Sequence, residues 1–96
     1  MTYILSTQTA STRANFEKVD AVIGPEVPSG LIARYVGTDG NGLCITTIWS
    51  SKADSDRFAA ERLFPALREV FGELPGEPAT AVGFEAVDDL VIEVAR

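Results

Sequence analysis

The residues best suited to contact a ligand are an arginine and a tryptophan on two neighbouring predicted strands. Arg34 falls within the strand predicted at 31–36, and Trp49 ends the strand predicted at 43–49. The Asp-Gly and Asn-Gly dipeptides between the two strands predict an antiparallel hairpin. One two-residue turn places Thr47 opposite Arg34. A turn shifted along the chain places Trp49 nearly opposite Arg34 instead. Either register puts Arg34 and Trp49 on the same face of the sheet. A three-residue bulged loop would break this shared parity.

An inward-facing arginine is informative because a charge is rarely buried without a partner. Arg34 is interpreted either as a group that binds an anion or a carbonyl beside an aromatic wall, or as one half of an ion pair with an acidic residue at the strand edge. Arg62 lies one helical turn after Phe58, where it either reaches the same cavity or lies on a solvated helix face. Trp49 and Phe84 are interpreted as pocket walls or as simple core packing. The candidate ligand contacts are therefore Arg34, Thr47, Trp49, Phe58, Arg62 and Phe84.

The sequence contains none of the common catalytic sets. It has no histidine, and hence no Ser-His-Asp or Cys-His arrangement, and it has no phosphate-binding glycine loop. The adjacent carboxylates Asp54/Asp56 and Asp88/Asp89 should diverge into solvent, so we expect no metal site and no cofactor. Cys44, the lone cysteine, is interpreted as a small buried residue. A general base would have to be a perturbed carboxylate or the substrate itself.

The first half of the chain predicts a strand, a helix and the hairpin. Tyr3-Ile4-Leu5 is β-prone, and Ser11 or Thr12 can cap a helix after it. Phe16, Val19 and Ile23 then recur at helical spacing, and Gly24-Pro25 ends the helix.

The second half predicts a helix and a final strand. Ser51 to Asp54 resembles a capping box, and large apolar residues continue at helical spacing until Gly72. Pro65 predicts either a kink or the start of a second short helix. A last strand is expected at 81–87, with a possible extension at 90–94. The order β-α-β-β-α-β is that of a ferredoxin-like split βαβ domain spanning residues 1–96, an α+β fold with an antiparallel sheet and helices on one face.

The two central strands predict a dimer. Each of their faces is mostly apolar or β-branched, whereas a sheet face left to water should alternate to polar side chains. Helices cover one face, and the simplest cover for the other is a second copy packed sheet to sheet, with Tyr35 in the interface. The alternative is a monomer with a weakly polar back face.

Charge and composition narrow the partners. The 96 residues include 8 basic and 14 acidic side chains, a net charge of −6, which repels phosphate backbones and anionic lipids. No stretch approaches the roughly 20 apolar residues of a membrane span. The lone cysteine and the absence of a signal-peptide pattern suit a reducing compartment. We therefore expect a cytoplasmic protein that binds neither nucleic acid nor membranes.

The stretch from Gly30 to Gly72 resembles the antibiotic-biosynthesis-monooxygenase-like families of dimeric α+β barrel proteins. The matching pieces are the Gly-Leu-Ile strand, the glycine-rich hairpin, Trp49-Ser50-Ser51 and the helix from Phe58 to Leu67. The resemblance implies the fold more strongly than the function, because one fold hosts many activities. Its members include cofactor-independent oxygenases of aromatic polyketides, haem-degrading enzymes, isomerases and proteins of no known activity.

In the oxygenase and haem-degrading branches, the equivalent of Trp49 lines a pocket between sheet and helices. Its partners there are an asparagine near the first strand and, in haem degraders, a histidine on the second helix. This sequence has Ser6 and Thr7 near the first position and Ala59 and Ala60 near the second. The resemblance therefore carries over Trp49 alone.

Two functional hypotheses follow. The first is a homodimer that holds a small apolar or aromatic molecule between sheet and helices, as a cofactor-independent monooxygenase, an isomerase or a binder. The second is a non-catalytic interaction module with the same fold. A cavity of at least about 300 Å³ lined by Arg34 would favour the first hypothesis, and a filled core with Arg34 in an ion pair would favour the second.

Overall fold

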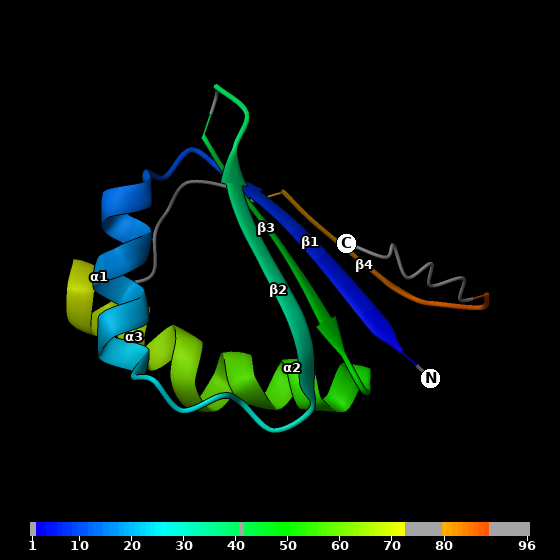
Figure 1. Ribbon diagram of the computed structural model, residues 1–96. Helices are drawn as coiled ribbons and strands as arrows, with labels where there is room; N and C mark the ends of the chain where they lie inside the picture. The colour runs from blue at the N-terminus through cyan, green and yellow to red at the C-terminus, as the bar shows by residue number, and fades with distance from the viewer. Residues whose placement is uncertain (1, 41, 73–79, 89–96) are drawn as a thin grey trace, which may run out of the picture.

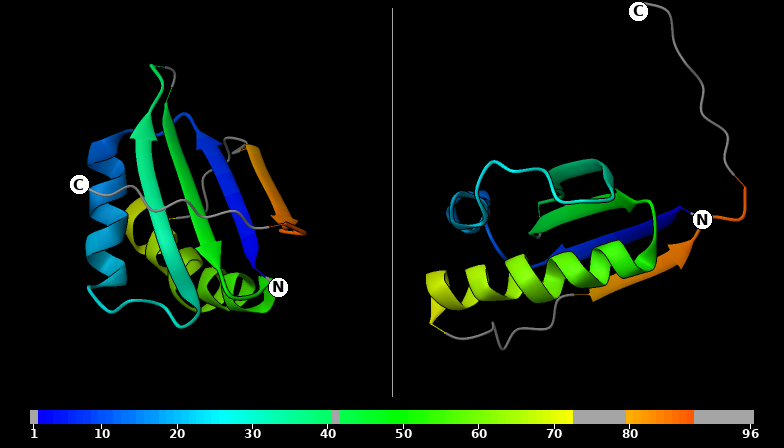
Figure 2. Two further views of the ribbon diagram at one scale, coloured as in Figure 1. Left: turned by 45° about the vertical axis from the view of Figure 1, so that its right-hand side comes forward. Right: turned by 90° about the horizontal axis from the view of Figure 1, so that it is seen from below.

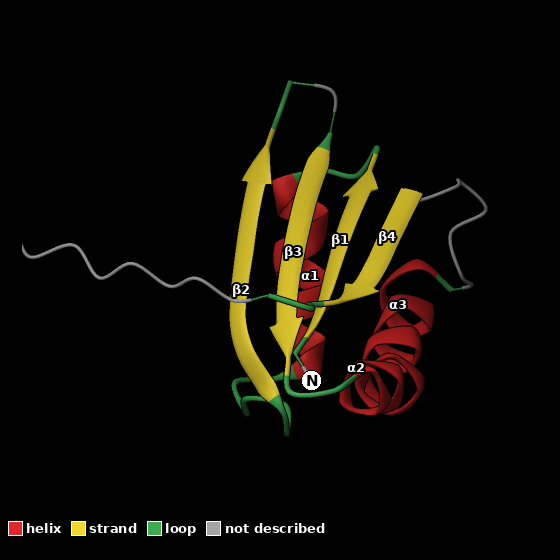
Figure 3. Ribbon diagram, turned by 90° about the vertical axis from the view of Figure 1, so that its right-hand side faces the viewer, coloured by secondary structure: helices red, strands yellow, loops and turns green. Residues whose placement is uncertain are grey.

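The computed structural model describes residues 2–40, 42–72 and 80–88. Its elements are β1 (Tyr3–Thr9), α1 (Arg13–Ile23), β2 (Leu31–Thr38), β3 (Leu43–Trp49), α2 (Lys52–Phe58), the π-helical turn η1 (Ala59–Leu63), α3 (Phe64–Phe71) and β4 (Thr80–Glu85). Within these residues the strands form one antiparallel sheet in the order β2-β3-β1-β4. All helices lie on one face of the sheet (Figures 1–3). The predicted split βαβ arrangement is confirmed.

Helix α1 begins and ends at the predicted residues. The Thr12 hydroxyl accepts a hydrogen bond from the Asn15 N–H at 3.2 Å, which satisfies a donor that the first turn leaves free. Gly24 ends the helix with φ of 94°, a conformation that favours glycine, while its N–H bonds to the Asp20 carbonyl. Local sequence therefore sets both ends of the helix.

The second helical segment is continuous but contains one wide turn. Ser51 caps α2 by accepting from the Asp54 N–H at 3.2 Å, as predicted. Pro65 has no N–H to give the carbonyl four residues before it, and the preceding turn η1 adopts π geometry, with the Phe64 N–H bonding to the Ala59 carbonyl. The π turn leads directly into α3, whose first turn contains Pro65, in agreement with the predicted alternative in which Pro65 begins a second short helix.

The strand register decides which side chains share a face. Arg34 pairs with Thr47, and Leu31 pairs with Trp49 after a bulge near Ile32, which confirms the first of the two predicted hairpin registers. Side chains alternate along a strand. The face beneath the helices therefore carries a row of residues across the four strands: Leu31, Trp49, Tyr3 and Glu85.

Among the described residues, no helix lies on the opposite face, as Figure 3 shows. We call it the open face and define it by two rows that cross the sheet: Ala33, Ile48, Ile4 and Phe84, and Tyr35, Thr46, Ser6 and Val82. Tyr35, Val82 and Phe84 are 65%, 57% and 50% exposed. The most buried apolar residues lie on the helix-covered side or in the helices: Tyr3, Val19, Leu43, Trp49 and Ala66.

Three strand predictions differ from the structure in length, and one of them is the second strand, which runs to Thr38 and does not stop at residue 36. The first strand extends to Thr9 and does not stop at residue 5, because it pairs with both β3 and β4. The last strand spans 80–85 in place of 81–87, and the predicted extension at 90–94 lies outside the described residues. Among the described helices, none is long and apolar enough to cross a membrane.

Candidate functional site

Trp49 is the most buried large side chain among the described residues, and its indole nitrogen is a buried polar atom without a hydrogen-bond partner there. It is 2% exposed, and its ring centroid lies 5.4 Å from that of Phe58, with the planes tilted by 39°. Among the residues described, its indole N–H is buried and has no hydrogen-bond partner. Buried donors are nearly always paired, so an unpaired one needs an explanation.

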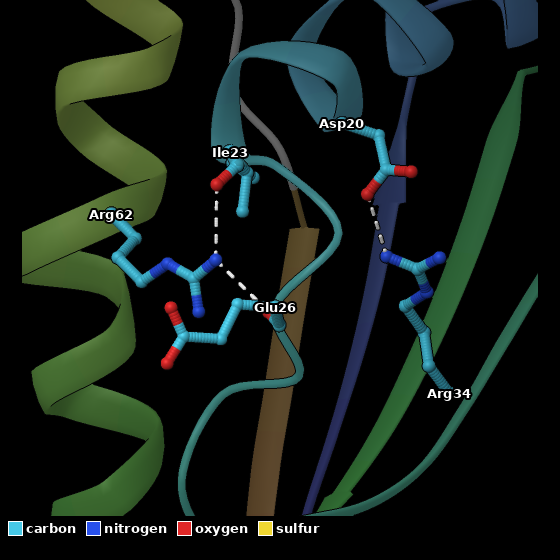
Figure 4. Close-up of polar contacts among 5 residues, drawn as sticks. All are labelled: Asp20, Ile23, Glu26, Arg34 and Arg62. Atoms are coloured by element: carbon cyan, nitrogen blue, oxygen red, sulfur yellow. Dashed lines mark hydrogen bonds and ion pairs between the residues drawn. The ribbon is translucent and has the colours of Figure 1, made fainter.

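Arg62 connects the π turn to the end of α1 (Figure 4). Its Nη2 donates to the carbonyl oxygens of Ile23 and Glu26, each at 3.0 Å. The Ile23 carbonyl lies in the last turn of α1, where helix carbonyls lack partners, and Glu26 lies in the connection that follows. The guanidinium also lies 5.8 Å from the centre of the Phe58 ring. The alternative in which Arg62 lies on a solvated helix face is wrong, because tertiary packing gives its stem and head specific partners.

Two small cavities flank Arg62. One has a volume of about 190 Å³ and the other about 230 Å³, and Glu61 and Arg62 border both. Phe58, Val27 and Pro28 give the first cavity apolar walls, and the rest of its lining is polar or charged: Glu26, Ser29, Asp54, Arg57, Glu61 and Arg62. Phe58 also packs against Trp49, which borders neither cavity. Two of the predicted contacts, Phe58 and Arg62, thus border one cavity, and Phe58 also contacts a third, Trp49.

Arg34 is held elsewhere (Figure 4). Its Nη1 lies 2.9 Å from the Asp20 carboxylate of α1, and its guanidinium lies 5.3 Å from the centre of the Phe16 ring. Both side chains of the ion pair are about two-fifths exposed, so the pair contributes little to stability. Neither cavity is bordered by Arg34, and neither reaches about 300 Å³. These observations favour the ion-pair interpretation of Arg34, although the acidic partner comes from a helix and not from the strand edge. By the criterion of cavity volume and Arg34 pairing, they count against a ligand site lined by Arg34 and favour the interaction-module hypothesis.

Thr47 and Phe84 border neither of the two cavities beside Arg62. The Thr47 hydroxyl donates to the Leu5 carbonyl at 3.5 Å, within the helix-covered layer. Phe84 pairs with Ile4 and projects from the open face, opposite to Trp49. The prediction that Phe84 lies in the core or lines the same pocket is therefore wrong for this chain, because its position in β4 has the other parity and leaves it half exposed.

The carboxylates near the start of α2 have nearby partners. Asp54 accepts from the Ser51 hydroxyl at 3.0 Å and pairs with Arg57. Asp56 pairs with Lys52 at 2.9 Å, and the hydrogen bond and then the charge of Asp56 raise the pKa of Lys52, with a smaller contribution from Tyr3. These carboxylates hold cations in place, and neither is positioned as a free base.

Cys44 lies on the open face near the hairpin. Partial burial first, and then the charge of Asp39 and a hydrogen bond with it, raise the pKa of the thiol above its ordinary value. A higher pKa leaves less thiolate at a given pH, and the thiolate is the reactive form. We expect the midpoint of the pH profile for alkylation by iodoacetamide to lie above that of a free cysteine. Asp39→Asn should move this midpoint to lower pH.

The midpoint of the pH profile is compared, and not the absolute rate of alkylation, because packing of the open face affects that rate in the wild-type protein and in Asp39→Asn alike. Asp20→Asn removes a carboxylate beside Arg34 and should leave the midpoint in place. An unchanged midpoint in Asp39→Asn would show that Asp39 does not control the thiol.

No protein-family model and no curated protein sequence matches this chain. Solved structures match its fold over nearly their whole length. Rv0793 from Mycobacterium tuberculosis has a TM-score of 0.70 at 15% identity, covering 95% of this chain and 100% of its own. SnoaB, a cofactor-independent oxygenase from Streptomyces nogalater, has a TM-score of 0.61 at 12% identity, covering 93% and 95%. The ActVA-Orf6 monooxygenase of Streptomyces coelicolor, in complex with nanaomycin D, has a TM-score of 0.59 at 18% identity, covering 96% and 92%. The chain therefore has the α+β fold of the antibiotic-biosynthesis monooxygenases.

Proposed function

We propose that this protein binds a small, largely apolar molecule between sheet and helices, with the Trp49 indole N–H donating to an acceptor atom of that molecule. The buried and unpaired indole N–H carries the proposal. A buried donor without a partner costs about 1–3 kcal/mol, and a ligand acceptor would recover part of that loss. Trp49 packs against Phe58, which borders the cavity, so a ligand in that cavity would reach the indole if the Phe58 ring turned aside.

The ligand should be small, because the cavity in front of Phe58 holds only about 190 Å³. An aromatic or alicyclic ring suits the walls formed by Phe58, Val27 and Pro28. A carbonyl oxygen suits the indole, which can only donate. The oxygenase and the ligand-bound monooxygenase among the fold neighbours support a small-molecule role in general terms.

The proposal includes a homodimer formed through the open face. Four described strands leave that face without cover, and its central row is apolar from Ala33 to Phe84. A second copy related by a two-fold axis would bury the same face on both chains. Such a dimer would hold two ligand sites on its outer, helix-covered sides, in a cytoplasmic protein.

The experiment compares two bicyclic molecules that differ in one carbonyl, 1-tetralone and tetralin. Calorimetric titration should show that the wild-type protein binds the ketone about three- to tenfold more tightly, as expected for one hydrogen bond. Trp49→Phe keeps an aromatic ring but removes the N–H, and should bind both molecules equally. Equal binding by the wild-type protein, or no binding of either molecule, would contradict the proposal.

Oxygenation of the bound molecule is a second candidate, favoured by the fold shared with SnoaB. Asp54 and Asp56 are in ion pairs, whereas Glu26 and Glu61 also border the cavity. A reaction would begin with the loss of a proton from the substrate, to one of these glutamates or to solvent. Oxygen uptake with 1-naphthol, measured with and without Trp49→Phe, separates a catalyst from a binder.

A further inference from the structure

The connection between α1 and β2 forms one wall of the cavity that Phe58 borders. We call residues 24–30 the strap. Strap residues 26–29 border the cavity on one side, and residues of α2 and the π turn border it on the other. The strap contains neither helix nor strand, and Val27 within it is 70% exposed. Segments with exposed side chains and few buried contacts are the parts of a fold that open most readily.

A glycine with positive φ lies at each end of the strap. Gly24 has φ of 94° and ψ of 172°, a backbone conformation that is almost confined to glycine. Gly30 has φ of 87°, and a Cβ atom there would overlap the Asp54 carboxyl group of α2. Leu31, the next residue, pairs with Trp49 across the sheet. The strap therefore has a hinge at both ends, and its second end adjoins the residue paired with the buried tryptophan.

Arg62 holds the strap against the helical segment (Figure 4). Its Nη2 donates to the Ile23 carbonyl, just before Gly24, and to the Glu26 carbonyl within the strap, so these two hydrogen bonds span the first hinge. The guanidinium also lies 5.8 Å from the centre of the Phe58 ring, within the range of a cation–π contact. One side chain thus contacts both the strap and the ring that packs against Trp49.

We propose that the strap is a gate to the cavity and that Arg62 is its latch. In the closed state Arg62 ties the strap to the helical segment and restrains the Phe58 ring. When these contacts break, the strap swings away about Gly24 and Gly30, and the Phe58 ring is free to turn aside from Trp49. This inference rests on the proposed binding function and adds the route by which the ligand reaches the indole N–H.

Amide hydrogen exchange, followed by NMR without ligand, measures the opening of the strap. The Leu31 N–H donates to the Pro28 carbonyl at 3.2 Å, in a turn that contains Gly30, so rotation at Gly30 exposes this amide. Arg62→Met keeps an unbranched stem but removes the charged donor, and should raise the exchange rate of Leu31 at least about tenfold. Arg68→Met, at an exposed arginine of α3 that borders neither cavity, should leave this rate unchanged.

The urea dependence of this exchange separates strap opening from unfolding of the whole domain. Strap opening exposes little surface, so exchange of Leu31 in the wild-type protein should not depend on low concentrations of urea. A dependence as steep as that of the amides between β1 and β3 would show that Leu31 exchanges only by global unfolding, and would overturn the gate.

Gly24→Ala tests the hinge without changing Arg62 or the cavity. A Cβ atom at residue 24 would meet nothing within 4 Å, and Gly24 borders neither cavity, so alanine acts through the backbone alone. Alanine disfavours the closed conformation and should raise Leu31 exchange at least about fivefold. Gly37→Ala is the matched control, because Gly37 has no positive φ and a Cβ atom there also meets nothing within 4 Å.

Stopped-flow quenching of Trp49, the single tryptophan, measures the entry of 1-tetralone. If only the open strap admits the ligand, the population of the open state sets the association rate. Arg62→Met and Gly24→Ala should therefore raise the association rate constant by the same factors by which they raise Leu31 exchange. An association rate that stays at the wild-type value while Leu31 exchange rises would show that the ligand enters elsewhere, and would overturn the gate.

The outcomes for the two proposals are distinct. A ketone preference in the wild-type protein, together with unchanged Leu31 exchange in Arg62→Met and Gly24→Ala, would overturn this inference while supporting the proposed function. If Arg62→Met does not fold, Arg62→Lys, which keeps the charge but loses the planar donor geometry, tests the latch by a smaller rise in the same rates. No binding of 1-tetralone by the wild-type protein would overturn the proposed function and the gate with it.

Discussion

Trp49→Ala should lower the free energy of unfolding by about 3–5 kcal/mol, the range found when a large buried aromatic side chain is truncated. Trp49 is 2% exposed and packs against Phe58, so its removal leaves a cavity that the surrounding strands and helix cannot close. Such a loss is a large fraction of the stability of a small domain. Urea unfolding followed by circular dichroism, at one fixed protomer concentration, measures the effect.

Trp49→Phe distinguishes packing from hydrogen bonding. Phenylalanine fills most of the indole volume and removes the unpaired N–H, whose burial costs about 1–3 kcal/mol. The loss of packing and the gain from removing this donor oppose each other, so we expect a net destabilisation below about 2 kcal/mol. Val27→Ala, at a side chain 70% exposed, is the control and should change stability by less than about 0.5 kcal/mol. Equal destabilisation by alanine and phenylalanine would mean that the indole N–H has a partner in solution.

Local signals in the sequence predict the fold well. Thr12, Gly24, Ser51 and Gly72 act within a turn of their own positions, so caps and helix ends follow from neighbouring residues. The hairpin signals likewise predicted the pairing of β2 with β3, although they left two registers open, and the structure has the one with Thr47 opposite Arg34.

Contacts between distant elements are harder to predict. The partner of Arg34 is Asp20, and it depends on how α1 packs over β2. The partners of Arg62 are carbonyls 36 and 39 residues away, although Pro65 already signals an irregular turn beside it. No local sequence pattern predicts these partners.

The sheet face from which each side chain of β4 projects is a third feature that is hard to predict from the sequence. Phe84 projects from the open face because its neighbour Gly83 faces the helix-covered side of the sheet, where it lies against Tyr3. Nothing near residue 84 fixes its pairing with β1, so its face could not be derived from the strand alone. A glycine between two apolar residues of a predicted strand was the available signal.

Phe84→Asp should convert a dimer into a monomer without unfolding the chain. Phe84 is half exposed at one end of the apolar row of the open face, so the single chain tolerates a polar group there. In a two-fold dimer each substitution occurs twice, and two carboxylates would lose water in the same interface. The desolvation of unpaired charges costs several kcal/mol, which corresponds to a dimer dissociation constant at least about 1,000-fold higher.

Sedimentation equilibrium measures this change directly, and circular dichroism shows whether the fold is kept. Val27→Asp is the matched control, because it places the same charge at a still more exposed apolar residue in the connection between α1 and β2, away from the open face. It should leave the dissociation constant unchanged. A wild-type protein that sediments at 10.3 kDa at all concentrations would contradict the dimer. In that case the apolar row from Ala33 to Phe84 would be a sheet face that water covers, and the proposed ligand site, which lies on the helix-covered side of a single chain, would be unaffected.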